Sequence, residues 1–128
     1  MTDVPTTVAA YFRAVNQQDW DELATLFVPD AEIHPVGSRP RRGREEVLAY
    51  YPRVLAGFAE HEDVVERAHV AGDVVTAEIS FTGRTHEGVP VRFDAVDVFD
   101  LRDDRIARIS LWYDTADVLR QVRGGGAA

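Results

Sequence analysis

The sequence predicts an α+β fold in which N-terminal helices pack inside a curved antiparallel β-sheet. Two patterns predict it. Up to about residue 58, apolar residues recur three and four positions apart, which is typical of amphipathic helices. From about Asp63 to Tyr113 they alternate with period two, which is typical of strands with one buried face. Such layers share one core, and a curved sheet leaves a cone-shaped apolar cavity facing the helices.

The first two helices are expected near the N-terminus. The first follows Pro5, a residue favoured in the first turn, and its apolar face carries Val8, Tyr11, Phe12 and Val15. The second begins at Asp19, with Glu22 three residues later as a capping-box partner, and ends at Pro29. Its apolar side consists of Leu23, Leu26 and Phe27.

A short strand at residues 31–36 and an exposed loop at residues 37–43 are expected next. Glu45 and Glu46 then suit the positive N-terminal end of a third helix. Its apolar stripe consists of Val47, Tyr50, Tyr51, Val54, Leu55 and Phe58.

The antiparallel strands are expected at residues 64–70, 74–82, 89–101 and 105–113. They are separated by turn residues at Gly72-Asp73, His86-Glu87-Gly88 and Asp103-Asp104. A short helix over residues 115–122 follows. We therefore expect a single domain over residues 1–122 and a flexible tail over residues 123–128, where three consecutive glycines occur.

Composition excludes several classes of partner. A chain of 128 residues with 45% hydrophobic content can form one core, and its net charge of −8 argues against nucleic acid and anionic membranes as partners. Cysteine is absent, so disulfides and thiolate chemistry are excluded. Neither an apolar stretch near 18 residues nor a signal-like leader at Met1 is present, which favours a cytoplasmic protein.

Asp97 is the most informative residue. On the strand from Val91 to Leu101, it falls on the face that also carries Ala95 and Phe99. A carboxylate there loses its hydration, so it needs a strong partner or stays protonated with a raised pKa. The alternative is a register shift or bulge that turns Asp97 toward water.

Three segments resemble a known family, the nuclear-transport-factor-2-like (NTF2-like) superfamily, in its ketosteroid isomerase-like and SnoaL-like branch. They are Tyr11-Phe-Arg-Ala-Val-Asn16 with Asp19 and Leu26-Phe27, then Pro35-Val-Gly-Ser-Arg-Pro-Arg-Arg-Gly43, and Asp97-Val-Phe99. The resemblance covers the chain to about Val122. It implies the fold of a cone and a cavity that binds a small apolar carbonyl or phenol-like ligand. The same scaffold hosts many unrelated functions.

The resemblance also implies roles for individual residues. Tyr11 falls at the tyrosine that donates to the substrate's oxyanion. Asp97 falls at the second donor, a carboxylic acid kept neutral by apolar surroundings, for which ketosteroid isomerase is the standard worked case. Tyr51 falls at the tyrosine that orients the first phenol. Together with Tyr51, the side chains expected to contact the substrate are Phe58, Phe81, Phe99 and Trp112; for Trp112 a dimer interface is the alternative.

The chain departs from the isomerases at the base. Where they carry an aspartate directly before the Pro-Val-Gly-Ser run, this sequence has His34. A neutral imidazole suits proton abstraction at pH 7, and Glu32, two residues earlier on the same strand face, can orient it. The alternative is a structural histidine at the end of a strand.

Other chemistries find less support. The histidines and acidic residues lack the spacing of a metal site, and no cofactor-binding motif is present, so neither a metal nor a cofactor is expected. Limonene epoxide hydrolase shares the implied fold, but its last-strand aspartate falls at Leu111 here.

Two functions remain open. The first is an enzyme that moves a proton next to a carbonyl, as a steroid isomerase-like or polyketide cyclase-like protein, with Tyr11, His34 and Asp97 as catalytic residues. The second is a non-catalytic binding protein that uses the same donors. Val96, Val98 and Trp112 form an apolar strip on the other face of the sheet, which predicts a homodimer.

Overall fold

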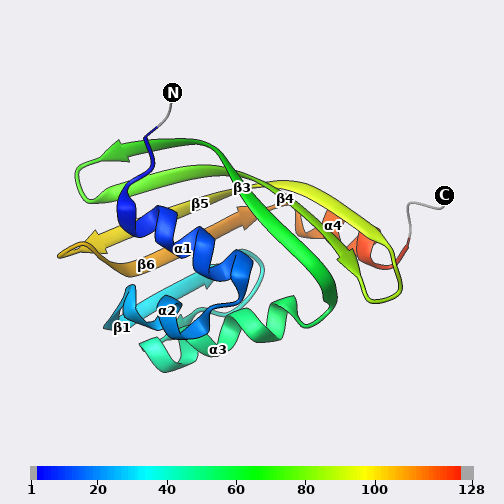
Figure 1. Ribbon diagram of the computed structural model, residues 1–128, viewed down its shortest axis with the longest axis horizontal. Coiled ribbons are helices and arrows are strands. Elements are labelled where there is room, and N and C mark those ends of the chain that lie inside the picture. The colour runs from blue at the N-terminus through cyan, green and yellow to red at the C-terminus, as the bar shows by residue number, and fades with distance from the viewer. Residues whose placement is uncertain (1–2, 125–128) are drawn as a thin grey trace.

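The computed structural model describes residues 3–124, which form four helices and one six-stranded sheet (Figure 1). The helices are α1 (Thr6–Gln17), α2 (Trp20–Thr25), α3 (Arg44–Leu55) and α4 (Thr115–Val122). The strands are β1 (Phe27–Pro35), β2 (Arg41–Arg42), β3 (Phe58–Ala71), β4 (Val74–Thr85), β5 (Pro90–Arg102) and β6 (Arg105–Tyr113). Their order in the sheet is β2-β1-β6-β5-β4-β3, and all neighbours are antiparallel except β1 and β6.

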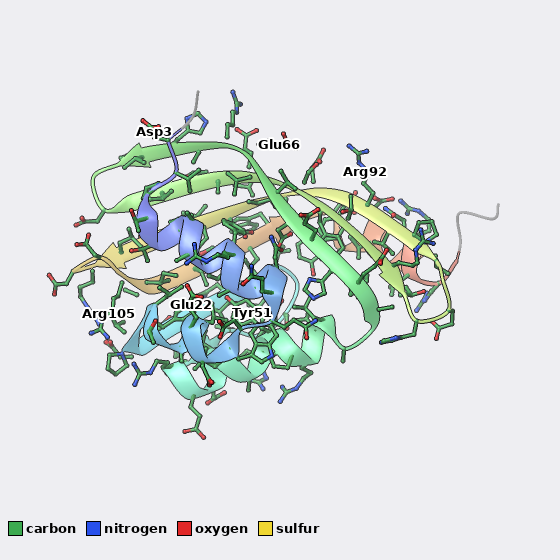
Figure 2. The ribbon with its side chains drawn as sticks, in the orientation of Figure 1. Asp3, Glu22, Tyr51, Glu66, Arg92 and Arg105 are labelled. Atoms are coloured by element: carbon green, nitrogen blue, oxygen red, sulfur yellow. The ribbon has the colours of Figure 1, made fainter. Side chains whose placement is uncertain are left out.

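The sheet curves around the N-terminal helices. In Figure 1, α1, α2 and α3 lie on one side of it, and the long strands β3 to β5 bend over α1. Figure 2 shows Tyr51 in the interior, whereas Glu66 and Arg92 extend away from it. The predicted α+β architecture, with helices packed in a curved and largely antiparallel sheet, is confirmed.

The C-terminal elements have the predicted bounds. The strand at residues 105–113 and the helix at residues 115–122 are both present as expected. Asp103 and Asp104 adopt φ values of 52° and 64°, and such left-handed conformations match the right-handed twist of a tight hairpin. The turn chemistry of two acidic residues thus sets the register between β5 and β6.

The second helix is shorter than predicted. Its start is confirmed, since the Asp19 side chain accepts a hydrogen bond from the backbone N–H of Glu22 at 3.1 Å. However, α2 ends at Thr25, and Phe27 already belongs to β1. Pro29 lies inside β1 on an exposed stretch, where the register with β6 shifts between Phe27 and Glu32. Such a bulge tolerates a proline, which therefore does not end the element.

Strand β3 begins earlier than predicted. Phe58, expected in the third helix, is its first residue, and the loop at residues 37–43 contains the short strand β2. Opposite the start of β3, a Cβ atom at Gly83 would lie 3.0 Å from the Phe81 ring and 3.1 Å from the Glu60 carbonyl. Glycine therefore permits this close approach, in which the Phe58 and Phe81 rings pack edge to face at 5.3 Å.

The C-terminal helix is fastened to β5 by one side chain. The Gln121 amide donates to the carbonyl of Arg92 and accepts from its N–H, both at 2.8 Å. At this point β5 extends beyond its pairing with β6, which starts at Ala95. The amide thus satisfies backbone groups that β6 leaves free, and it holds α4 beside the sheet.

Two further findings concern the extent of the described chain and the character of its helices. Residues 125–128, most of the predicted flexible tail, lie outside the described part of the chain. Between residues 3 and 124, no helix has both the length and the apolar character needed to cross a lipid bilayer.

Trp112 leads us to predict a homodimer packed sheet against sheet. Its side chain is 54% exposed, and its register partner on β5 is Val96. We expect light scattering at micromolar concentration to give about twice the 14.3 kDa chain mass, and Trp112→Glu to give monomers. Leu119→Glu, which changes an exposed apolar residue on α4, is the matched control. A monomeric wild-type protein would contradict the prediction.

Candidate active site

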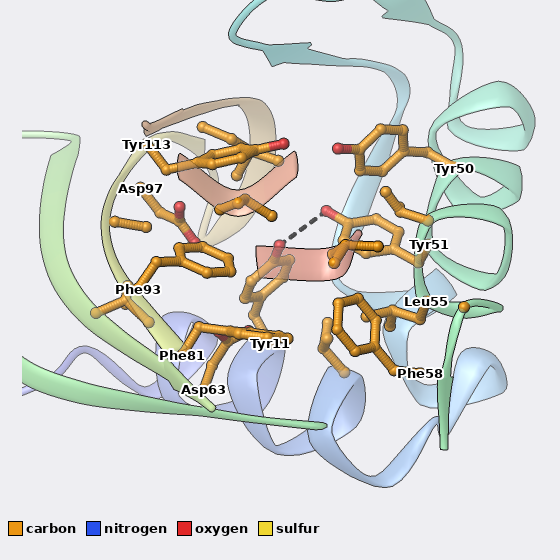
Figure 3. A pocket seen from close by; sticks show the side chains of 18 of the residues that line it. Tyr11, Tyr50, Tyr51, Leu55, Phe58, Asp63, Phe81, Phe93, Asp97 and Tyr113 are labelled. Atoms are coloured by element: carbon orange, nitrogen blue, oxygen red, sulfur yellow. Dashed lines mark hydrogen bonds between the residues drawn. The ribbon is translucent and has the colours of Figure 1, made fainter. Parts of the chain in front are cut away.

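A cavity of about 350 Å³ opens between α1, α3 and the concave face of the sheet (Figure 3). Tyrosine, phenylalanine and aliphatic side chains form most of its wall, and Val118 and Val122 of α4 contribute to it from the C-terminal end. The carboxyl groups in the wall belong to Asp63 and Asp97. Among the described residues that line the cavity, none is lysine, arginine or histidine. A mostly apolar cavity with a few polar groups is the usual form of a small-molecule site.

Two tyrosines place their hydroxyl groups together in the cavity. The hydroxyls of Tyr11 on α1 and Tyr51 on α3 are hydrogen-bonded at 2.9 Å (Figure 3). The Tyr11 ring is fixed by edge-to-face contacts with Phe12 at 4.9 Å and with Phe99 at 5.0 Å. Burial, together with nearby acidic groups, raises the pKa of both phenols well above the ordinary value. Both therefore stay protonated at neutral pH, and at least one hydroxyl proton is free to point into the cavity.

Asp97 lies on the cavity side of β5, as the alternation of this strand predicts. Its side chain is 8% exposed, and its register partners are Ala77 on β4 and Leu111 on β6. Burial among these apolar neighbours, and secondarily the charge of Asp63, raises the pKa of the Asp97 carboxyl well above its ordinary value. Burial therefore favours the neutral form of this carboxyl, and a neutral carboxylic acid can donate a hydrogen bond.

Asp63 is a second acidic residue in the wall, and the sequence interpretation missed it. It lies on β3, opposite Phe81. Burial, and secondarily the charge of Glu62, raises the pKa of Asp63 to about 6. The available signal was the same as for Asp97, an acid on an apolar strand face. Two adjacent valines, Val64 and Val65, obscured it, because either one could have been the inward residue.

The structure corrects the expected position of His34. Ile33, which is completely buried, takes the inward position on β1, so the ring of His34 points to the opposite face and is not part of the cavity wall. The expected contact with Glu32 is present at 2.8 Å, and Arg42 contacts the same carboxylate at 3.7 Å. His34 thus belongs to a surface ion-pair cluster, and the geometry gives it no access to a ligand in the cavity.

The expected substrate-contacting residues divide into two groups. Tyr51, Phe58 and Phe81 line the cavity. Phe99 is completely buried behind Tyr11, and Trp112 lies on the outer face of the sheet, so neither reaches a ligand there. The wall contains further aromatic residues that the sequence interpretation did not select: Tyr50, Phe93 and Tyr113.

Within residues 3–124, no cluster of three or more histidine or acidic side chains has the geometry to hold a metal ion.

Comparison with known proteins gives a consistent family and fold. The model of a family described as SnoaL-like domain matches residues 8–109. A protein of Catenulispora acidiphila with a ketosteroid isomerase-like fold, solved with trimethylamine, is 24% identical, with a TM-score of 0.86 over 94% of this chain and 95% of that one. Curated proteins give no match.

Two further solved structures are similar. IdmH of Streptomyces antibioticus, proposed to be a polyketide cyclase, is 26% identical, with a TM-score of 0.80 over 91% of this chain and 96% of that one. An epoxide hydrolase of M. tuberculosis related to limonene epoxide hydrolase is 23% identical, with a TM-score of 0.79 over 95% and 90% of the two chains. At this identity the hydrolase shows a common fold only.

Proposed function

Because the chain belongs to the SnoaL-like domain family, we propose that it is an enzyme that moves a proton next to a carbonyl group of a small apolar substrate in the cavity. Double-bond isomerisation and aldol-type cyclisation both begin with such a step. Tyr11 and neutral Asp97 donate hydrogen bonds to the carbonyl oxygen, and Tyr51 orients Tyr11. The similarity to IdmH, which is proposed to be a polyketide cyclase, supports this class of reaction.

One observation carries the proposal: a phenol and a carboxyl group, whose pKa values are both raised by burial, lie in the wall of one apolar cavity. The enolate that forms on proton removal carries its negative charge on oxygen. Donors already in place in a dry cavity stabilise that charge, each by a few kcal/mol, without reorganising solvent. The oxygen of the carbonyl form carries less negative charge, so the same donors stabilise it less. Because they stabilise the enolate-like transition state more than the substrate, they lower the barrier.

The second candidate is a non-catalytic binding protein. It is favoured by the wall itself, in which aromatic faces and two acidic groups occur without any basic side chain among the described residues. Such a wall also suits a small organic cation. The C. acidiphila protein with the similar fold binds trimethylamine.

Proton exchange distinguishes the two candidates. β-Tetralone, an apolar bicyclic ketone, loses its proton signal next to the carbonyl in deuterated water when an enzyme forms the enolate. NMR should show the protein accelerating this loss well above the buffer rate, and β-naphthol, which resembles the enol, should inhibit it. Binding of β-naphthol without any acceleration would establish the second candidate instead.

His34→Ala tests the corrected position of the histidine. We expect the exchange rate to stay within about threefold of wild type, because general-base effects of a hundredfold or more require contact with the substrate. The stability loss should also be small, since the contact between His34 and Glu32 is partly exposed. A hundredfold loss of exchange, with the fold intact by circular dichroism, would restore His34 as the base.

A further inference from the structure

We infer that Asp63 is the catalytic base, the group that takes the proton from the substrate carbon and returns it. This inference rests on the proposed function. It assigns the proton-transfer role to Asp63 on β3, a position for which neither the sequence pattern nor the family resemblance indicated a role.

Asp63 has a fixed position in the wall. β3 is the edge strand of the sheet, so its outer backbone groups have no strand partner. At Asp63 the side chain of Asn16, in the last turn of α1, replaces that partner: its amide donates to the carbonyl of Asp63 and accepts from its N–H, both at 2.9 Å. The same helix carries Tyr11, so one rigid element fixes both the oxyanion donor and the base.

Asp63 and Asp97 occupy separate places in the wall. Asp63 pairs with Phe81, which pairs with Phe93, and Phe93 precedes Asp97 by four residues on β5. In Figure 3, Asp63 lies near Phe81 and Asp97 lies near Phe93, while the Tyr11 hydroxyl points toward Tyr51. This separation suits two different roles: Asp97 with Tyr11 contacts the oxygen of the ligand, and Asp63 contacts a carbon further along it.

The surrounding charges also separate the roles. The ionisable groups that influence Asp63 or are influenced by it are Glu62 on its own strand, Asp97 on β5, Tyr11 on α1 and Tyr51 on α3. All four are acids, and the charge of Glu62 adds to burial in favouring the neutral form of Asp63. Its pKa of about 6 nevertheless leaves it mostly ionised at pH 7, whereas burial raises the pKa of Asp97 well above its ordinary value and favours its neutral form.

The proton transfer is balanced. The Asp63 carboxylate takes the proton as the carbon–hydrogen bond breaks, and the electron pair of that bond forms the carbon–carbon double bond of the enolate. The carbonyl π electrons move onto the oxygen, which Tyr11 and Asp97 hold. Asp63 then returns the proton, to the same carbon in exchange or to a conjugated carbon in isomerisation, and is regenerated as carboxylate.

The test is the pH dependence of β-tetralone exchange in wild type and Asp63→Asn. In wild type, we expect kcat/KM to rise with pH through an apparent pKa of about 6 and then to level. Asp63→Asn should exchange at least about a hundredfold more slowly, and its kcat/KM should no longer rise with pH. It should still bind β-naphthol. Retained naphthol binding shows that the variant is folded with its oxyanion donors in place.

Two further variants separate a base from a structural residue. Glu62→Gln removes a neighbouring charge that raises the pKa of Asp63, so it should keep the rate and move the rise to lower pH. Asn16→Ala should lower the exchange rate and keep the rise of kcat/KM with pH, since Asn16 positions Asp63 and does not titrate.

Exchange by wild type that survives in Asp63→Asn overturns the assignment of Asp63 alone. No exchange by wild type, with naphthol bound, overturns the proposed function and this inference together.

Discussion

Asp97→Leu is expected to weaken β-naphthol binding and to stabilise the fold at the same time. Leucine removes one of the two donors to the ligand oxygen, which should cost on the order of 2 kcal/mol, or roughly 30-fold in Kd at pH 7. Asp97→Asn keeps a donor of the same shape and should weaken binding only a few fold. Fluorescence titration with β-naphthol measures both. Equal affinity of Asp97→Leu and wild type would contradict the assignment of Asp97 as a donor.

The stabilisation should depend on pH in a defined direction. Burial raises the pKa of Asp97 in the folded protein, so the folded state keeps this proton at pH values where the unfolded state has lost it. Ionisation of Asp97 therefore favours unfolding. The free energy of unfolding of the wild-type protein declines as the pH rises above about 3.9, the pKa of an aspartate in the unfolded chain. Asp97→Leu lacks this penalty and adds apolar surface to the wall.

The pH series therefore carries its own control. The gain in Tm of Asp97→Leu over wild type should be smallest near pH 4 and largest near pH 8. Differential scanning fluorimetry across this range measures it. Asp97→Asn should show the same trend with a smaller gain. A gain of the same size at every pH would mean that Asp97 does not titrate abnormally.

Tyr11→Phe is expected to lower β-tetralone exchange by roughly a hundredfold to a thousandfold, because it removes the phenolic donor to the developing oxyanion. The aromatic contacts with Phe12 and Phe99 remain, so the ring keeps its place. The Tyr51 hydroxyl loses its partner, which should cost about 1–3 kcal/mol of stability, and the assay should run well below Tm.

Tyr51→Phe is the matched control. It removes the other hydroxyl of the same hydrogen bond, and we expect a loss of only about tenfold because Tyr51 acts through Tyr11. The two single variants then differ although they break the same contact. Equal losses in both would contradict the assignment of Tyr11 as the hydroxyl that contacts the substrate oxygen directly.

The sequence determined the fold class, the C-terminal elements and the inward position of Asp97. These depend on local rules. Period two assigns every second residue of β5 to one face, and Asp103 and Asp104 specify the tight turn that joins β5 to β6. An acid among Phe93, Ala95 and Phe99 is recognisable without knowing what packs opposite.

Only the tertiary structure decided which polar groups share the cavity. Alternation divides a strand into two faces without saying which face meets the helices. On β1, the completely buried Ile33 turns inward, so His34 turns outward. On β3, Val65 packs against the core and Val64 is exposed, which turns Asp63 into the cavity. Both outcomes depend on contacts between segments far apart in the chain. These contacts are the parallel pairing of β1 with β6 and the two hydrogen bonds between the Asn16 side chain and the Asp63 backbone.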